Sequence, residues 1–148
     1  QVAALVASLL KGGKKLKPQL MYGTAPEELG QLPLADQSRQ FIVDAMRETV
    51  EHERGTAKRL LRADAVMGGK TGTAQVVKIG DVRLKSHEMA YEHRDHAWMA
   101  TWGMKDGKTY VVVVMLEHGG GGSSAAGPLA VAMYNKPFGP PPAKTASR

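Results

Sequence analysis

The sequence has no cysteine, few aromatic residues and no long apolar run. Without cysteine the chain has no disulfide bond, no thiolate metal ligand and no cysteine nucleophile. Its longest apolar run covers residues 111–116, far short of the about 20 residues that a membrane-spanning helix needs. Aromatic residues make up 5% of the chain and do not alternate with basic residues. A base-stacking platform, and with it a nucleic-acid partner, is therefore not expected.

The length and the charge are compatible with both an enzyme and a binding module. The chain has 148 residues, of which 43% are hydrophobic, enough for the core of one domain. Its formal net charge of +6 favours anionic partners without identifying one. A non-catalytic binding module, whose basic face docks an anionic polymer or a partner protein, is therefore an alternative to an enzyme.

The first half of the sequence predicts two helices and little strand. Apolar residues at helical spacing predict a helix over residues 2–10, which a pair of glycines ends. Residues 17–22 are expected to form a short edge strand, and residues 24–34 a loop. A second helix, capped by Asp36 or Ser38, is expected to follow.

The second half predicts an antiparallel sheet. A strand is expected over residues 66–78, followed by a polar loop over residues 79–94. Two further strands, over residues 96–104 and 108–117, meet at Asp106-Gly107, which is the strongest hairpin signal in the sequence. The last of these strands is continuously apolar, and this predicts burial on both of its faces.

The C-terminal part predicts one more helix and a tail. Residues 125–134 follow a glycine stretch and favour a helix with Ser123 or Ser124 as its cap. Residues 137–148 are rich in proline and are expected to be a flexible tail, which leaves residues 1–136 as the folded portion. The predicted fold class is α/β (α+β), with an antiparallel sheet flanked by helices on both faces.

One stretch in the middle of the chain combines the groups that bind a carboxylate. Residues 70–75 read Lys-Thr-Gly-Thr-Ala-Gln, directly after two glycines. On a strand, Lys70 can supply positive potential to a substrate carboxylate, and the hydroxyls of Thr71 and Thr73 can hydrogen-bond it. Gly72 lets an extended ligand approach the strand edge, and the main-chain N–H of Thr73 can serve as an oxyanion donor. The stretch therefore predicts a ligand-facing strand.

Four separated segments carry a further signal. They are, in chain order, Gly55-Thr56-Ala57-Lys58, Gly69-Lys70-Thr71-Gly72-Thr73-Ala74-Gln75, Arg94-Asp95-His96-Ala97-Trp98-Met99 and Glu117-His118-Gly119-Gly120-Gly121-Gly122. Their content and order resemble the class B penicillin-binding proteins, and within that family the elongation-type members. The resemblance extends from Gln1 to about Tyr134, and it identifies the chain as similar to the C-terminal part of the family's transpeptidase domain.

The resemblance implies a fold and an activity. The fold is a five-stranded antiparallel sheet with helices on both faces. The activity is that of a peptidoglycan D,D-transpeptidase, a serine-type enzyme without a cofactor, which cross-links stem peptides through an acyl-enzyme and which β-lactams acylate. By resemblance, the substrate carboxylate is held by Lys70, Thr71, Gly72 and Thr73, with Thr73 also completing the oxyanion hole. Gln75 is a further substrate-binding candidate.

Partners and location are also implied by the resemblance alone. The expected partners are peptidoglycan stem peptides, β-lactam antibiotics, the remainder of the transpeptidase domain and the cell-wall elongation machinery. The expected location is the periplasmic face of the bacterial inner membrane, with the membrane anchor outside this chain.

Two motifs of the family are missing from the sequence. Ser-x-Asn is absent, because the only asparagine is Asn135. Ser8 and Lys11 satisfy Ser-x-x-Lys literally, but we expect both on the polar, solvated face of the first helix, unlike a nucleophile in a tuned, buried site. The catalytic serine, its lysine and the middle motif are therefore expected upstream of Gln1. This chain alone is expected to hold no catalytic residue and to be inactive.

Two other interpretations stay open. In a serine β-lactamase, a hydrolase of the same superfamily, water replaces the acceptor amine, and the lysine-threonine-glycine strand alone does not separate the two. Histidines and carboxylates between residues 87 and 96, among them His87, His93 and His96, could offer ligands to zinc. Their spacing is not the i, i+4 pair of a metalloprotease helix, and no metal is expected.

Overall fold

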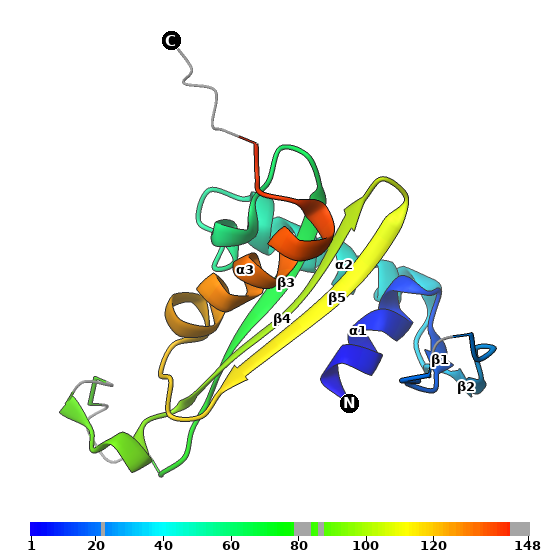
Figure 1. Cartoon of the computed structure of the whole chain (residues 1–148). Coiled ribbons are helices and arrows are strands. Elements are labelled where there is room, and N and C mark those ends of the chain that lie inside the picture. The colour runs from blue at the N-terminus through cyan, green and yellow to red at the C-terminus, as the bar shows by residue number, and fades with distance from the viewer. Residues whose placement is uncertain (22, 79–83, 86–87, 143–148) are drawn as a thin grey trace.

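A three-stranded antiparallel sheet carries the predicted motif (Figure 1). The computed structural model describes residues 1–21, 23–78, 84–85 and 88–142. Its helices are α1 (Val2–Leu10), α2 (Asp36–Glu51) and α3 (Gly127–Phe138), and its strands are β1 (Lys14–Leu16), β2 (Glu28–Gln31), β3 (Val66–Ala74), β4 (His96–Lys105) and β5 (Lys108–Leu116). Short helical turns are η1 (Lys58–Leu60), η3 (Tyr91–His93) and the π-helical turn η4 (Gly122–Ala126). None of the helices in the described part of the chain has the length and apolar character needed to cross a membrane.

The sheet has the order β3-β4-β5, with both pairs antiparallel. The hairpin prediction is confirmed: β4 and β5 are joined by Asp106 and Gly107, whose φ angles of 50° and 71° are those of a tight turn with the twist of the flanking strands. The described residues contribute three strands to this sheet, whereas the family resemblance implies five. Strands β1 and β2 form a separate two-stranded sheet.

Helices cover both faces of the sheet, which confirms the predicted fold class. One face packs against α3 and η1, and its core is built from alternate strand residues such as Met99 and Val114 together with Tyr134. The other face packs against α1 and α2 through Val6, Met46 and Trp102. Strand periodicity places neighbouring residues of β4 on opposite faces, so both cores draw on the same strand.

Trp102 explains one of the glycines that precede the motif. The indole is 1% exposed and lies directly across from Gly68 in the register of β3 and β4. A Cβ at position 68 would lie 2.6 Å from Cζ2 of the ring, so only glycine fits beneath it. Trp102 is therefore a core residue.

Burial of β5 on both faces, as expected from its apolar run, is wrong for the described chain. Val112 and Val114 are buried towards α3, but Met115 on the other face is 42% exposed, and Val111 and Val113 are half-buried. The outer edge of β5 has no strand partner among the described residues. An open, mainly apolar groove of about 640 Å³ runs between this strand and α3, past Leu129 and Met133.

The N-terminal segments differ from the sequence prediction in two places. Residues 17–20 are not a strand, and the predicted loop contains β2, which pairs with β1. One ion pair joins the two strands, Lys14 with Glu28 at 3.3 Å, and a second joins the residues just beyond them, Lys17 with Glu27 at 2.8 Å. The lysines thus have partners distant in sequence, which a local pattern does not reveal.

Two predictions about the helices α1 and α2 differ from the structure. Helix α1 has the predicted bounds, but Ser8 is 4% exposed and donates to the carbonyl oxygen of Ala4, so its predicted solvation is wrong. The predicted cap of α2 is wrong: the helix begins at Asp36 itself, and its N-cap residue is Ala35, without a side-chain hydrogen bond. Phe41 of this helix is 73% exposed.

The last helix is longer than predicted. It starts at Gly127, after η4, and continues through Pro137 to Phe138, which is 5% exposed. Ser124 does not cap it and instead donates to the carbonyl oxygen of Gly121. The expected start of the tail at residue 137 therefore falls inside α3.

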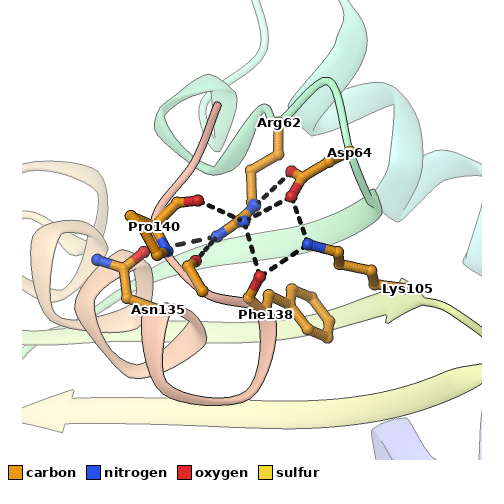
Figure 2. Close-up of polar contacts among 7 residues, drawn as sticks. Arg62, Asp64, Lys105, Asn135, Phe138 and Pro140 are labelled. Atoms are coloured by element: carbon orange, nitrogen blue, oxygen red, sulfur yellow. Dashed lines mark hydrogen bonds and ion pairs between the residues drawn. The ribbon is translucent and has the colours of Figure 1, made fainter. Parts of the chain in front are cut away.

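A charged network fixes the end of α3 (Figure 2). Arg62 donates to both carboxylate oxygens of Asp64 at 2.9 Å and to the carbonyl oxygen of Gly139 at 3.0 Å. Lys105 donates to the same carboxylate at 2.6 Å and to the carbonyl oxygen of Phe138 at 2.7 Å. Hydrogen bonds from Arg62 and then Lys105 hold the pKa of Asp64 well below its usual value. The network joins the segment before β3, the β4–β5 hairpin and α3.

Candidate functional site

One edge of β3 is not paired with another strand in the described chain. The register between β3 and β4 is continuous from Val66 to Ala74, and the carbonyl oxygen of Gly69 accepts a hydrogen bond from Thr49 Oγ1 of α2 at 2.5 Å. The main-chain N–H and C=O groups of successive residues point to opposite edges of an antiparallel strand. Those of Thr71 and Thr73 therefore point to the same unpaired edge as the carbonyl oxygen of Gly69. The carbonyl oxygen of Thr71 accepts from Lys70 Nζ, which is consistent with this direction.

An open groove of about 460 Å³ lies along this edge. Two turns form its other walls, one before η1 and one at the glycine-rich segment after β5. The lining residues are Thr56, Arg59, Lys70, Thr71, Gly72, Thr73, Gly121, Gly122, Ser123 and Ser124. Hydroxyl groups and two cations therefore face the groove, and none of the aspartates and glutamates that the structure describes lines it.

The glycine-rich turn is seated directly on the motif strand. A Cβ at Gly122 would lie 2.6 Å from the carbonyl oxygen of Gly72 and would also clash with the carbonyl oxygen of Trp98. Because both neighbours are backbone atoms, neither can move aside cheaply. Gly122 thus lets the turn close over β3 and form one wall of the groove.

Two histidines anchor the start of the same turn. The main-chain N–H of His118 donates to His96 Nδ1 at 2.9 Å, and His118 Nδ1 lies 3.1 Å from the carbonyl oxygen of Arg94. The two imidazole rings meet edge to face with centroids 4.9 Å apart. His118 itself has a φ of 55°, an uncommon conformation for a residue with a side chain. These contacts tie the turn to the beginning of β4.

The turn before η1 is tied to β3 as well. Thr71 Oγ1 donates to Thr56 Oγ1 at 3.2 Å. Ala57 and Leu60 are buried, and a Cβ at Gly69 would lie 3.1 Å and 3.2 Å from their side chains. Gly69 is therefore the position at which this turn approaches the strand most closely.

The structure brings together most of the predicted site residues. Lys70, Thr71, Gly72 and Thr73 line the groove, with Lys70 and Thr73 exposed. Gln75 follows the last residue of β3 and does not line it. Ser8, on α1, is not a lining residue either.

Sequence reasoning did not assign Thr56, Arg59 or the serines after the glycine run to the site. The glycine run itself, followed by two serines, was the available signal for a backbone segment that approaches another closely.

A metal site is not found among the described residues. No group of three or more histidine, aspartate or glutamate side chains there is arranged to hold an ion. His96 is engaged with the N–H of His118, and His87 lies outside the described residues.

Comparisons with known proteins show the family and the fold of the chain. The family model described as the penicillin binding protein transpeptidase domain matches residues 1–135. Among solved structures, the complex between penicillin-binding protein PBP2 and MreC from Helicobacter pylori is similar, with 27% identity and a TM-score of 0.64. Pseudomonas aeruginosa PBP2 in complex with WCK 5153 gives 22% identity and a TM-score of 0.64. The apo transpeptidase domain of Burkholderia pseudomallei penicillin-binding protein 3 gives 17% identity and a TM-score of 0.60.

The extent of these matches is one-sided. They cover 92%, 98% and 95% of this chain but only 24%, 31% and 42% of the respective relatives. The chain therefore spans about a quarter to two fifths of the length of the proteins whose fold it shares. A search of curated proteins finds no match.

Proposed function

The chain belongs to the penicillin-binding protein transpeptidase domain family, and from this we propose that it forms the substrate-docking wall of a peptidoglycan D,D-transpeptidase. The observation that carries the proposal is the groove along the free edge of β3. Lys70, Thr71 and Thr73 line it together, opposite the glycine-rich turn, and no carboxylate from residues 1–21, 23–78, 84–85 or 88–142 lines it. Such a cationic, hydroxyl-lined strand edge suits an extended peptide that ends in a carboxylate.

In the proposed reaction a serine hydroxyl attacks the carbonyl carbon of the D-alanyl-D-alanine bond. The C–N bond breaks, the terminal D-alanine leaves as the protonated amine, and an ester to the serine remains. An acceptor amine then attacks the ester, the C–O bond breaks and the serine regains its proton. A β-lactam would follow the first step alone, because its leaving amine stays tethered.

The residues of this chain would bind and orient the donor. Lys70 and the hydroxyls of Thr71 and Thr73 would hold its terminal carboxylate, and Gly72 would let it lie against the strand. The N–H of Thr73, on the unpaired edge, would stabilise the oxyanion. Gln75, just beyond the strand, would contact the donor further along its length.

The attacking serine would come from polypeptide outside this chain. Two observations support this: the Ser-x-Asn motif is absent, and the buried hydroxyl of Ser8 donates a hydrogen bond to the carbonyl oxygen of Ala4. The serine's lysine and the middle motif would lie in the same polypeptide. In this proposal the chain up to the end of α3 at Phe138 is the C-terminal portion of a transpeptidase domain.

The remainder of the domain would pair with the outer edge of β5. The open groove between β5 and α3 is mainly apolar, and Met115, Leu129 and Met133 on it are 42%, 45% and 54% exposed. An added strand would satisfy the edge of β5 and cover these side chains. It would also bring the sheet closer to the five strands that the family resemblance implies.

Substrate, partner and place in the cell follow from the same proposal. The donor and acceptor would be peptidoglycan stem peptides, β-lactams would acylate the site, and the enzyme would work at the periplasmic face of the inner membrane. The relative from Helicobacter pylori is in complex with MreC, which favours a role beside the cell-wall elongation machinery. The family match after the motif favours a transpeptidase over a β-lactamase-type hydrolase.

Intact-mass measurement after incubation with benzylpenicillin tests the proposal. We expect no adduct on this chain alone, and one adduct on the polypeptide that carries the Ser-x-x-Lys motif when the two are present in one domain. In that domain, Lys70→Gln should slow acylation by about tenfold or more, as expected for a lost charge-assisted hydrogen bond. Lys78→Gln, an exposed lysine outside the groove, is the matched control. A stoichiometric adduct on Ser8 would refute the proposal.

A further inference from the structure

Arg59 is a second cation at the groove, and its backbone is held in place. It lies in η1, between Ala57 and Leu60, which are 0% and 2% exposed. The N–H of Ala57 donates to the carbonyl oxygen of Thr49 at 2.9 Å, and the side chains of both neighbours pack on Gly69 of β3. The position of Arg59 relative to the motif strand is therefore fixed by the core beneath it.

The stem of the Arg59 side chain lies against the start of α3. A Cβ at Gly127 would lie 3.5 Å from Arg59 Cδ and 3.8 Å from Nε, so the arginine runs past a position without a side chain. From there it reaches the groove that Lys70 also lines. The two cations that line the groove thus come from different elements, Lys70 from β3 and Arg59 from η1.

The guanidinium of Arg59 has free donors. It makes no hydrogen bond or ion pair with any residue that the structure describes. Two basic residues near it in the sequence do have partners. Lys58 Nζ donates to the carbonyl oxygen of Glu53, and Arg62 is paired with Asp64 and binds the end of α3 (Figure 2). Only Arg59 of these three both faces the groove and lacks a partner in the described chain.

We propose that Arg59 is a specificity-determining residue that binds the terminal carboxylate of the acyl donor together with Lys70. Lysine is a point charge on a flexible stem, and Lys70 Nζ also donates to the carbonyl oxygen of Thr71. Arginine presents a planar pair of N–H groups that matches both carboxylate oxygens. Arg59 thus fixes the orientation of the carboxylate, while Lys70 supplies the charge on its other side. This inference rests on the proposed function.

The test compares two ligands that differ only at the carboxylate. Benzylpenicillin carries it, and benzylpenicillin methyl ester does not. The second-order acylation rate constant of each is measured on the whole transpeptidase domain that includes this chain, and their ratio reports recognition of the carboxylate. Arg59→Gln should lower this ratio by about tenfold, the loss of one charge-assisted hydrogen bond at an open site. Arg59→Lys should lower it by less.

Controls separate a contact from a structural role. Lys58→Gln removes the same charge one residue away, outside the groove, and should leave the ratio within about twofold of the wild type, because a surface charge that does not contact the ligand contributes little to its binding. All three variants should keep the wild-type melting temperature, since both side chains are exposed.

The outcomes that overturn the inference are distinct from those that overturn the proposed function. If Arg59→Gln slows both ligands equally, or slows neither, Arg59 does not bind the carboxylate, even though the domain is acylated. If benzylpenicillin does not acylate the wild-type domain at all, the proposed function fails and the inference fails with it.

Discussion

Gly122 and Gly72 meet backbone to backbone: a Cβ on Gly122 would lie 2.6 Å from the carbonyl oxygen of Gly72 and 3.0 Å from its nitrogen. The two glycines are 50 residues apart in sequence, yet their contact sets the distance between the glycine-rich turn and the motif strand. The groove exists because this contact has no side chain in it.

Substitution at Gly122 should therefore damage the site. Gly122→Ala should destabilise the transpeptidase domain by about 1–3 kcal/mol through overpacking, and should slow acylation by benzylpenicillin because the turn is pushed off β3. Gly127→Ala is the matched control, since its Cβ would meet neighbours only at 3.5 Å or more in a helical residue. Acylation by Gly122→Ala at the wild-type rate would show that the contact does not shape the groove.

The carboxylate of Asp64 should be a pH-dependent source of stability. Asp64→Asn should lower the free energy of unfolding at pH 7 by about 1–3 kcal/mol, because charge-assisted hydrogen bonds from Arg62 and Lys105 are weakened. The pKa of Asp64 is lowered on folding, so its contribution is present above the unfolded value near 3.8 and is lost as the pH falls below it.

Urea denaturation at several pH values measures the effect of Asp64. The difference between the wild type and Asp64→Asn should shrink as the pH falls from 5 towards 2. Asp44→Asn, which changes an exposed carboxylate on α2, should cause little loss at any of these pH values. A difference for Asp64→Asn that does not depend on pH would contradict the prediction.

The buried hydroxyl pair of Tyr134 and Thr101 should make the fold less stable at high pH. Tyr134 is 1% exposed, its hydroxyl lies 3.0 Å from Thr101 Oγ1, and burial raises its pKa to about 12. The folded pKa lies above the unfolded value of 10.0, so the stabilisation is complete below pH 10 and is lost as the pH rises through 12. Tyr134→Phe should weaken that pH dependence and cost about 1 kcal/mol at pH 7.

Denaturation between pH 8 and 12 tests this role of Tyr134. Tyr91→Phe, at a tyrosine that is 62% exposed, is the control and should keep the wild-type profile. Thr101→Val should cost more at pH 7 than Tyr134→Phe, because it removes the hydroxyl that lies 3.0 Å from the buried tyrosine oxygen and leaves that oxygen in place. The opposite order would contradict this account of the pair.

This chain by itself should be poorly stable, because the edge of β5 and the apolar groove beside α3 have no cover among the described residues. Met133→Lys should reduce association of the isolated chain, because it places a charge in the exposed apolar groove. In the whole domain the same substitution should be destabilising, because the remainder of the domain then covers the groove. Met104→Lys, at an exposed methionine outside the groove, should not show this reversal. Light scattering and thermal melting measure both effects, and a cooperative, high-temperature melt of the chain alone would contradict the prediction.

Local signals predicted much of the fold. The spacing of apolar residues predicted α1, Asp106-Gly107 predicted the β4–β5 hairpin, and the motif from Lys70 to Ala74 lies on a strand as predicted. These features depend on neighbours in sequence. The β1–β2 hairpin was not predicted, because its strands and its ion pair between Lys14 and Glu28 join residues that are distant in sequence. The predicted N-caps of α2 and α3 are wrong, because neither helix has a side-chain hydrogen bond at its N-terminus.

The sequence by itself determined which chemistry this protein carries: a cation, two hydroxyls and a glycine in fixed order on β3, within the transpeptidase domain family, and no Ser-x-Asn motif. Only the tertiary structure decided that Thr56, Arg59 and Gly122 join them in one groove and that Gln75 stands outside it. The physical reason is that a groove is made where segments far apart in sequence pack together. Glycine-to-backbone contacts of that kind leave no periodic trace in the chain.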